Sequence, residues 1–200
     1  MNIDLEHVVY WMDAIRMSPD PVRTLESFWR GQLKSKLWLI EQLDDLVTGT
    51  DDITIDIVGG WNGVLASLLF QRYSNIKHIR SVDIDPVCEP IASMMNKTEE
   101  MSGRFTTVTA DMCDLEYTAD IVINTSCEHM TQEDYDRWLD RTPETSTIVL
   151  QSNNYEIDEH VRIANDLEHF VEQSRVTAEK KGVLVLPLYC RYMIIGKRTL

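Results

Sequence analysis

The sequence has few basic residues beside its many acidic ones. Nineteen lysines and arginines stand against 33 aspartates and glutamates, and the formal net charge is -14. A surface this acidic repels phosphate backbones and anionic lipid headgroups, so we expect neither nucleic acid nor a membrane as a partner. The apolar runs are also far shorter than the stretch of about 20 residues that spans a bilayer. The sequence leaves the oligomeric state open, a homo-oligomer included.

Cysteine is also scarce, and the cysteines are scattered. The chain has four, Cys88, Cys113, Cys127 and Cys190, with no Cys-x-x-Cys pair among them. A zinc cage needs more tightly clustered ligands, and a small disulfide scaffold is denser in cysteine. We therefore expect reduced thiols, no metal site and a cytoplasmic location. The N-terminal residues Met-Asn-Ile-Asp-Leu-Glu show no basic region ahead of an apolar run, so we expect no signal peptide.

The length and composition fit one globular domain. Two hundred residues, 44% of them hydrophobic, are enough to bury a substantial core. Apolar residues at three- and four-residue steps predict helices over residues 4–17 and 22–47. Residues 1–50 are therefore expected to form a helical cap on a core of residues 51–200, within a single domain.

From residue 53 onward, short apolar runs alternate with amphipathic segments. This alternation predicts a mostly parallel sheet covered by helices on both faces. The expected strands are 53–58, 78–83, 105–108, 119–124, 146–151, 183–188 and 190–196. The expected helices are 63–73, 86–100, 131–140 and 157–178.

The C-terminal segment departs from this alternation. The runs at 183–188 and 190–196 leave no room between them for a crossover helix, so they must pair as an antiparallel hairpin. The predicted fold class is therefore α/β: a Rossmann-like, seven-stranded, mostly parallel sheet with an antiparallel C-terminal hairpin and an N-terminal helical cap.

Three glycines follow the first expected strand, in the segment Ile53-Thr-Ile-Asp-Ile-Val-Gly-Gly-Trp-Asn-Gly63. Glycines between a strand and a helix let a ligand approach the backbone, and an acid after the next strand accepts hydrogen bonds from a ribose diol. The second strand ends in such an acid, Asp83. Asp85 precedes Pro86, which is typical of a helix start, so we expect Asp85 to cap the helix and Asp83 to bind the ribose. The pattern indicates a nucleoside site but does not identify the nucleoside.

The order of these elements and motifs resembles the class I S-adenosylmethionine-dependent methyltransferases over about residues 50–198. In that family a seventh strand is inserted antiparallel into the sheet. The resemblance implies S-adenosylmethionine as the cofactor and a small molecule as the substrate. It also implies a set of cofactor-binding residues: Gly59, Gly60, Trp61, Gly63, Asp83, Ile84, Asp111, Met112 and Asn124.

The glycine motif departs from the family pattern, in which an acid is followed by glycines two, four and six residues later. If Gly59 and Gly63 are the first and third of these glycines, Trp61 stands where the middle one is usual, and Asp56 is displaced by one position. A tryptophan there could pack under the cofactor or narrow the pocket. The acid after the third strand, Asp111, could alternatively be a solvated loop residue.

A dense polar run, Asn124-Thr-Ser-Cys-Glu-His129, follows the fourth expected strand. Open α/β sheets bind ligands at the carboxyl ends of their strands, so this run is a candidate active-site loop. The resemblance implies a Glu-His pair near the transferred methyl group. Glu128 could hold a substrate amine or the sulfonium region, and His129 could act as a general base because its pKa lies near neutrality. The alternative is a loop whose side chains satisfy its own backbone.

The fifth strand is followed by a similar run, Gln151-Ser-Asn-Asn-Tyr155, whose amides and phenol suit a small polar substrate. Asn153 and Tyr155 are the substrate-binding candidates, and His160 is expected to be a structural residue on a helix. Ordinary strand residues are expected near the hairpin turn: Tyr189, Arg191 and Tyr192.

Methyl transfer from S-adenosylmethionine to a small polar acceptor is the function that the resemblance implies. Two alternatives stay open. An enzyme of the same fold can use S-adenosylmethionine without methyl transfer, by lyase, cyclase or aminopropyl-type chemistry, and a relative can bind it without catalysis. An NAD-dependent oxidoreductase is a weaker alternative, because the antiparallel terminal hairpin counts against it.

Overall fold

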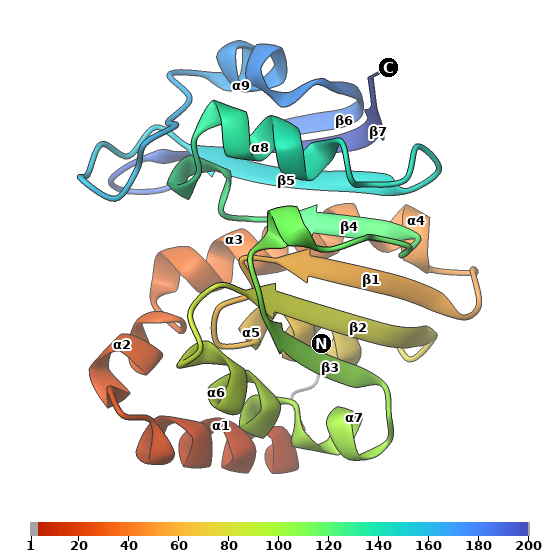
Figure 1. Cartoon of the computed structure of the whole chain (residues 1–200). Coiled ribbons are helices and arrows are strands. Elements are labelled where there is room, and N and C mark those ends of the chain that lie inside the picture. Colours follow the sequence, from red (N-terminus) through yellow and green to blue (C-terminus); the bar gives the residue numbers. More distant parts are fainter. Residues whose placement is uncertain (1–3, 200) are drawn as a thin grey trace. The chain divides into compact units, whose positions relative to one another are not determined.

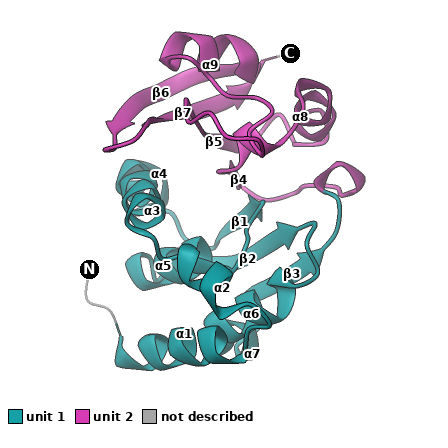
Figure 2. Cartoon of the chain, turned by 90° about the vertical axis from the view of Figure 1, so that its left-hand side faces the viewer, with its two compact units in different colours: residues 1–111 teal, residues 112–200 magenta. Residues whose placement is uncertain are grey.

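The computed structural model describes residues 4–199. Four residues lie outside the described ones: Met1, Asn2, Ile3 and Leu200. The expectation of no signal peptide concerns the N-terminal segment, whose first three residues are among these four. The chain forms two compact units, residues 1–111 and residues 112–200 (Figure 2). The single domain remains a prediction.

The first unit begins with helices and continues as strands alternating with helices (Figure 1). Its elements are α1 (Leu5–Met17), α2 (Pro21–Glu26), α3 (Arg30–Gln42), α4 (Asp44–Val47), β1 (Ile53–Val58), α5 (Val64–Arg72), β2 (Ile76–Asp83), α6 (Cys88–Met95), α7 (Lys97–Met101) and β3 (Phe105–Thr109). Strand β2 lies between β1 and β3 and is parallel to both. Helix α1 packs on α6, and α5 packs on β2.

The expected helix over 22–47 is wrong as one element, because it is interrupted twice. Near residue 27 the hydrogen bonds change from the α-helical kind to the tighter 3-10 kind, which spans three residues. The Ser27 N–H donates to the Thr24 carbonyl at 3.2 Å, and the Phe28 N–H donates to the Leu25 carbonyl at 3.0 Å. The buried Ser27 hydroxyl also donates to the Thr24 carbonyl at 2.6 Å. A hydroxyl that takes up a helix carbonyl competes with continuation of the helix.

A second predicted helix, 86–100, also divides into two elements. The buried Asn96 side chain donates to the carbonyls of Gly63 and Ala92 at 3.1 and 2.9 Å, which ends α6 against the start of α5. Asp85 is not the N-cap residue of α6, because α6 begins at Cys88 and Val87 precedes it, but the Asp85 carboxylate accepts from the Val87 N–H at 3.0 Å in the turn that leads into the helix.

The second unit holds the remaining strands and two helices (Figure 1). Its elements are the 3-10 turn η1 (Met112–Asp114), β4 (Ile121–Asn124), the 3-10 turn η2 (Cys127–His129), α8 (Gln132–Leu139), β5 (Thr147–Asn153), α9 (Leu167–Ser174), β6 (Val176–Val185) and β7 (Cys190–Arg198). Strands β4 and β5 are parallel, whereas β7 is antiparallel to both β5 and β6. Helix α9 packs on β6 and β7.

The expected helix over 157–178 is wrong for most of its length. Its first part is a loop whose backbone donors bond to other segments: the N–H groups of Val161 and Arg162 donate to the Glu128 carbonyl at 2.9 and 3.1 Å, and that of Ala164 donates to the Asn153 carbonyl at 3.0 Å. Only Leu167–Ser174 is helical. These long-range bonds take up backbone donors that a helix would use within itself.

The end of the same segment is a strand, and the hairpin is therefore longer than expected. Strand β6 runs over Val176–Val185, where the expected strand was 183–188. Exposed residues alternate along it with more buried ones, which is the period of two of a strand. The long side chains of Glu179, Lys180 and Lys181 hid this period from the sequence.

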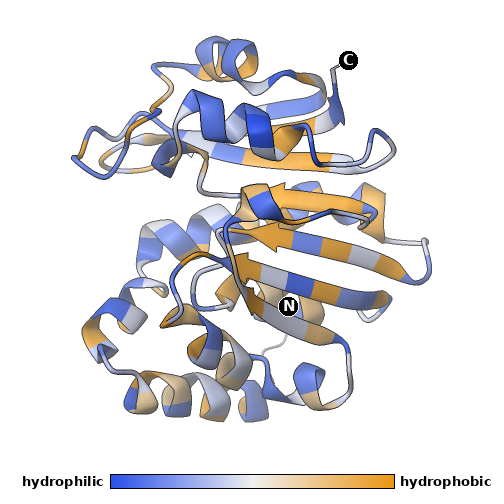
Figure 3. Cartoon of the chain, in the orientation of Figure 1, coloured by the Kyte–Doolittle hydropathy of each residue, from blue (hydrophilic) through white to orange (hydrophobic). Residues whose placement is uncertain are grey.

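The seven strands of the described residues follow the order β3-β2-β1-β4-β5-β7-β6. The predicted fold class, an α/β Rossmann-like fold with a mostly parallel sheet and an antiparallel C-terminal hairpin, is thereby confirmed. Strands β1 and β4 are hydrophobic along most of their length, whereas helix α8 is largely hydrophilic (Figure 3). Among residues 4–199, no helix has the length and the apolar character needed to cross a bilayer.

Candidate functional site

The glycine segment of the first unit forms a tight turn between β1 and α5. Three of its residues have left-handed backbone angles: Gly59 with φ 60°, Trp61 with φ 49° and Gly63 with φ 74°. Glycine takes this conformation without steric penalty, whereas Trp61 does not. A bulky residue held at positive φ is unusual, and such positions concentrate at ligand sites.

Asp83 holds this turn from the end of β2. Its Oδ2 atom accepts from the Trp61 backbone N–H at 2.8 Å, and its Oδ1 atom accepts from the Asp85 N–H at 3.0 Å. The carboxylate remains partly exposed. A carboxylate has about four acceptor positions, so both oxygens keep capacity for a ligand.

Close packing explains why glycines occupy two of these positions. A Cβ on Gly60 would meet the Ser81 hydroxyl at 2.0 Å, and a Cβ on Gly63 would lie 3.0 Å from the Cβ of Ala92. The Gly60 N–H also donates to the Val82 carbonyl at 2.9 Å. The turn is therefore seated directly on β2 and α6.

Asp56, the acid before the glycines, has a different partner. It is buried on β1 and lies opposite Arg80 of β2. The Arg80 guanidinium donates to both carboxylate oxygens at 2.8 Å. This bidentate pair occupies the Asp56 carboxylate within the sheet.

Three other predicted cofactor residues lie after the ends of β2 and β3. Ile84 follows Asp83 and is 69% exposed, which is unusual for a large apolar side chain beside a buried strand. The Ala110 N–H donates to the Asp83 carbonyl at 3.0 Å, which ties the segment before Asp111 to the end of β2. Asp111 and Met112 are both partly exposed. Their roles remain predictions.

In the second unit, Glu128 is the centre of a buried polar cluster. The side chain is 3% exposed. Its Oε1 atom accepts from Asn153 Nδ2 at 2.6 Å and forms an ion pair with the Arg191 guanidinium, which also donates to the Thr125 carbonyl. The structure thus brings together Glu128 from the loop after β4 and Asn153 from the end of β5, two predicted site residues.

Arg191 was expected to be an ordinary strand residue, and this expectation is wrong. It is 6% exposed on β7, and its register partner on β5 is Asn153. A buried arginine is rare unless it is paired. The sequence carried one signal for this role, an arginine near the start of the otherwise apolar run 190–196.

The predicted residues His129 and Tyr155 lie beside a third residue that the sequence placed elsewhere. His160 is in the loop after β5, not on a helix. Its ring lies 4.6 Å from the His129 ring and 6.2 Å from the Tyr155 ring, measured between centroids. The Tyr155 ring in turn lies 5.4 Å from the Tyr189 ring. These aromatic rings therefore group at the carboxyl ends of β4 and β5.

Two further residues of the polar run at the end of β4 are Asn124, whose side chain bonds to residues of the following loop, and Cys127, whose thiol is buried. The Asn124 side chain accepts from the Ser126 N–H at 2.9 Å and donates to the Met130 sulfur at 3.4 Å. Burial raises the pKa of the Cys127 thiol to about 12, which disfavours a nucleophilic thiolate. The cofactor role of Asn124 remains a prediction.

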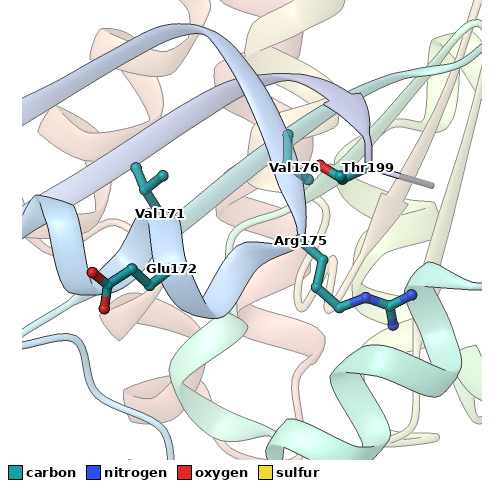
Figure 4. Close-up of a pocket in the computed structure, with 5 residues that line it drawn as sticks. All are labelled: Val171, Glu172, Arg175, Val176 and Thr199. Carbon is teal, nitrogen blue, oxygen red and sulfur yellow. The ribbon is translucent and has the colours of Figure 1, made fainter.

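A surface hollow in the second unit lies away from this edge. It is lined by Val171, Glu172, Arg175, Val176 and Thr199 (Figure 4). Thr199 of this lining follows the end of β7, where Gly196 pairs with Ile148 at the start of β5. The hollow therefore lies toward the amino end of β5, whereas Asn153 lies at the carboxyl end of that strand. The Arg175 guanidinium is already paired with Asp136 and Asp140 at 3.4 and 2.8 Å. Among the described residues that line the hollow, none offers a free cation for an anionic ligand.

Comparison with known proteins finds similarity in structure only. No family model matches the sequence, and no curated protein matches it. The pyocyanin biosynthetic protein PhzM superposes with a TM-score of 0.67 at 14% identity, over 94% of this chain and 62% of that chain. This chain thus spans less than two thirds of the length of PhzM.

Two further solved structures are matched along more of their own length. Magnesium protoporphyrin IX methyltransferase from Synechocystis, with S-adenosylmethionine bound, superposes with a TM-score of 0.65 at 15% identity over 99% of both chains. The [4+2]-cyclase SpnF superposes with a TM-score of 0.65 at 11% identity over 82% of this chain and 80% of that chain. Identities this low show the fold alone. The chain has the fold of the class I S-adenosylmethionine-dependent methyltransferases.

Proposed function

We propose that the chain binds S-adenosylmethionine and transfers its methyl group to a small polar acceptor. The observation that carries this proposal is the turn Gly59–Gly63, which is bonded to Asp83 through the Trp61 N–H at 2.8 Å. It joins a glycine turn, a helix start and an acid after the second strand, the parts from which α/β folds build nucleoside sites.

In this proposal Asp83 accepts hydrogen bonds from the ribose hydroxyls through its remaining acceptor positions. The exposed Ile84 covers one face of the adenine and thereby removes apolar surface from water. Asp111 and Met112 border the adenine, and the turn residues Gly59, Gly60, Trp61 and Gly63 approach the amino acid part of the cofactor.

Four residues of the second unit are proposed for the acceptor. Asn153 and Tyr155 bind the polar acceptor, and Glu128 orients an amine or hydroxyl on it. His129 donates through Nδ1 to the Glu159 carbonyl at 3.2 Å, so in the neutral ring Nε2 is the nitrogen that can take a proton from the acceptor. Because a sulfonium is already a good leaving group, positioning supplies most of the rate enhancement.

The structural neighbours support the cofactor more than they support any acceptor. One holds S-adenosylmethionine, and the geranyl diphosphate C-methyltransferase from Streptomyces coelicolor holds S-adenosylhomocysteine. Their substrates differ in kind, a magnesium porphyrin and a prenyl diphosphate. The acceptor of this chain is therefore proposed only as a small polar molecule.

A second candidate is use of S-adenosylmethionine, or of its pocket, without methyl transfer. The observation that favours it is the similarity to SpnF, whose described reaction is a [4+2] cyclisation on the same fold. Trp61, in the place of the usual middle glycine, is compatible with such a changed pocket.

Calorimetry with S-adenosylmethionine and S-adenosylhomocysteine tests the binding step. Absence of heat with both ligands would overturn the proposal. The chemistry is tested by incubating the full chain with labelled S-adenosylmethionine and a metabolite extract, followed by mass spectrometry. S-adenosylhomocysteine together with a methylated metabolite is the expected result, whereas methylthioadenosine would mean attack elsewhere on the cofactor. Binding without turnover would favour a non-catalytic relative.

A further inference from the structure

We propose that Glu128, His129 and His160 form a binding site for a divalent transition-metal ion, best matched by Zn²⁺. One ligand atom from each residue lies within 4.8 Å of the other two. All three residues belong to the second unit, at the carboxyl ends of β4 and β5. The proposal goes beyond methyl transfer and does not require S-adenosylmethionine.

The hydrogen bonds of the two histidines prepare one nitrogen of each ring for a metal. His129 Nδ1 lies 3.2 Å from the Glu159 carbonyl, and His160 Nδ1 lies 2.6 Å from the Tyr155 carbonyl. A carbonyl oxygen only accepts, so both Nδ1 atoms carry a proton, and in the neutral rings the lone pair lies on Nε2. A backbone carbonyl on the second ring nitrogen is the usual arrangement that orients a metal-binding histidine.

Glu128 supplies an independent sign of a missing ligand. Its Oε1 atom is bonded to Asn153 and Arg191, but its Oε2 atom is buried and has no hydrogen-bond partner among the described residues. A buried carboxylate oxygen without a partner is costly, because the charged group has lost its hydration and has gained nothing in its place. A cation bound at Oε2 would provide the partner. The side chain is 3% exposed, so water compensates little.

The donor set determines which ion fits. Two imidazoles and one carboxylate are ligands that Zn²⁺ takes in catalytic sites, where water or substrate fills the fourth position. Mg²⁺ prefers oxygen ligands and keeps its own waters, so two imidazoles disfavour it. Zn²⁺ holds its ligands at about 2.0–2.2 Å, so the ligand atoms must close on the ion. The exposed ring of His129 and the half-buried ring of His160 have the freedom to do so.

The site also gives the loop after β5 a function. That loop is anchored by the bonds from Val161 and Arg162 to the Glu128 carbonyl at 2.9 and 3.1 Å. These bonds bring His160 next to Glu128 and His129. A metal at His129 Nε2 and general-base action by that same atom exclude each other. Metal binding would therefore remove His129 as a proton acceptor.

Calorimetric titration of the full chain with ZnCl2, without S-adenosylmethionine, tests the site. We expect one Zn²⁺ per chain, and we expect His160→Ala to weaken its binding at least about tenfold, since loss of even an outer-shell partner has an effect of that size. His129→Ala should weaken it likewise. His78→Ala is the matched control, because His78 is a half-buried histidine of β2 in the first unit, and it should bind Zn²⁺ as the unchanged chain does.

Replacement of Zn²⁺ by Co²⁺ gives a second measurement. A site with two imidazoles should produce visible d–d absorption bands that are lost in His160→Ala, and circular dichroism establishes that each variant is folded. No Zn²⁺ binding, or equal binding by the unchanged chain, His129→Ala and His160→Ala, would overturn the site. Failure of this test together with intact S-adenosylmethionine binding leaves the proposed function standing, so the two proposals fail separately.

Discussion

The Trp61 backbone N–H donates to Asp83 Oδ2 at 2.8 Å, so the residue in the place of the usual middle glycine is bonded to the acid at the end of β2. One carboxylate thereby holds the glycine turn and stays partly exposed to a ligand. Its bond to the turn affects the free energy of unfolding, and its proposed contact with the ribose affects the affinity for S-adenosylmethionine. Experiments can therefore separate the two roles.

Asp83→Ala should weaken the binding of S-adenosylmethionine by about 1.5–3 kcal/mol, because hydrogen bonds from the ribose to a charged group are lost. Calorimetry measures the change in affinity. Asp114→Ala is the control, since Asp114 is an exposed acid in the turn η1, and it should leave the affinity unchanged. Unchanged affinity of a folded Asp83→Ala variant would mean that the ribose assignment is wrong.

Substitutions of Trp61 should depend on how well the new residue accepts φ 49°. Trp61→Gly should change the free energy of unfolding by less than about 1 kcal/mol, because relief of the left-handed backbone is offset by greater entropy of the unfolded chain. Trp61→Val should lower it by about 1–3 kcal/mol, since a β-branched residue at positive φ is strained. Urea unfolding followed by circular dichroism measures both. Equal stability of the two variants would contradict this account of the turn.

Arg191→Met should lower the free energy of unfolding by about 3–5 kcal/mol, because it leaves the buried Glu128 carboxylate without its cation. The double variant Arg191→Met/Glu128→Gln removes both charges and should recover much of the loss. Urea unfolding of these two variants and of Glu128→Gln alone gives the coupling between the two residues. Arg141→Met is the control: its partner Glu116 is exposed, so its effect should stay below about 1 kcal/mol. An Arg191→Met variant as stable as the control would exclude a strong buried pair.

Thiol labelling should separate the cysteines. Burial, with the nearby charges of Asp83 and Asp85, raises the pKa of Cys88 to about 12. At pH 8 its thiolate fraction is then on the order of 1 in 10,000, so iodoacetamide should modify Cys190, the one half-buried thiol, before Cys88. Peptide mass spectrometry after short labelling identifies the order, and the urea-unfolded chain is the control in which both react.

The same shift has a consequence at high pH. The folded state keeps the Cys88 proton up to about pH 12, whereas the unfolded chain releases it above about pH 8.5, the ordinary value for a thiol. The stabilising contribution of this thiol is therefore fully present at neutral pH and declines as the pH rises from about 8.5 towards 12. Cys88→Ala should reduce this alkaline decline in stability, measured by urea unfolding across that range. An equal decline in the variant would show that other groups cause it.

Local sequence predicted the elements whose hydrogen bonds are local or regular. The strand over 53–58 was predicted with its observed bounds, because a β-branched run between turn residues has few other conformations. The C-terminal hairpin followed from the short connection between its two apolar runs, which leaves no room for a crossover helix. The helices over 22–47 and 157–178 were mispredicted because buried side chains and distant carbonyls, at Ser27 and Glu128, took up the backbone bonds.

The candidate site divides in the same way. The sequence by itself determined that glycines follow the first strand, that an acid ends the second, and that polar runs follow the fourth and fifth, since these patterns lie within short segments. Only the tertiary structure decided that Asp56 pairs with Arg80, that Arg191 neutralises Glu128, and that His160 lies beside His129. Sequence patterns report on neighbours along the chain, whereas these contacts join residues whose meeting depends on strand register and on one anchored loop.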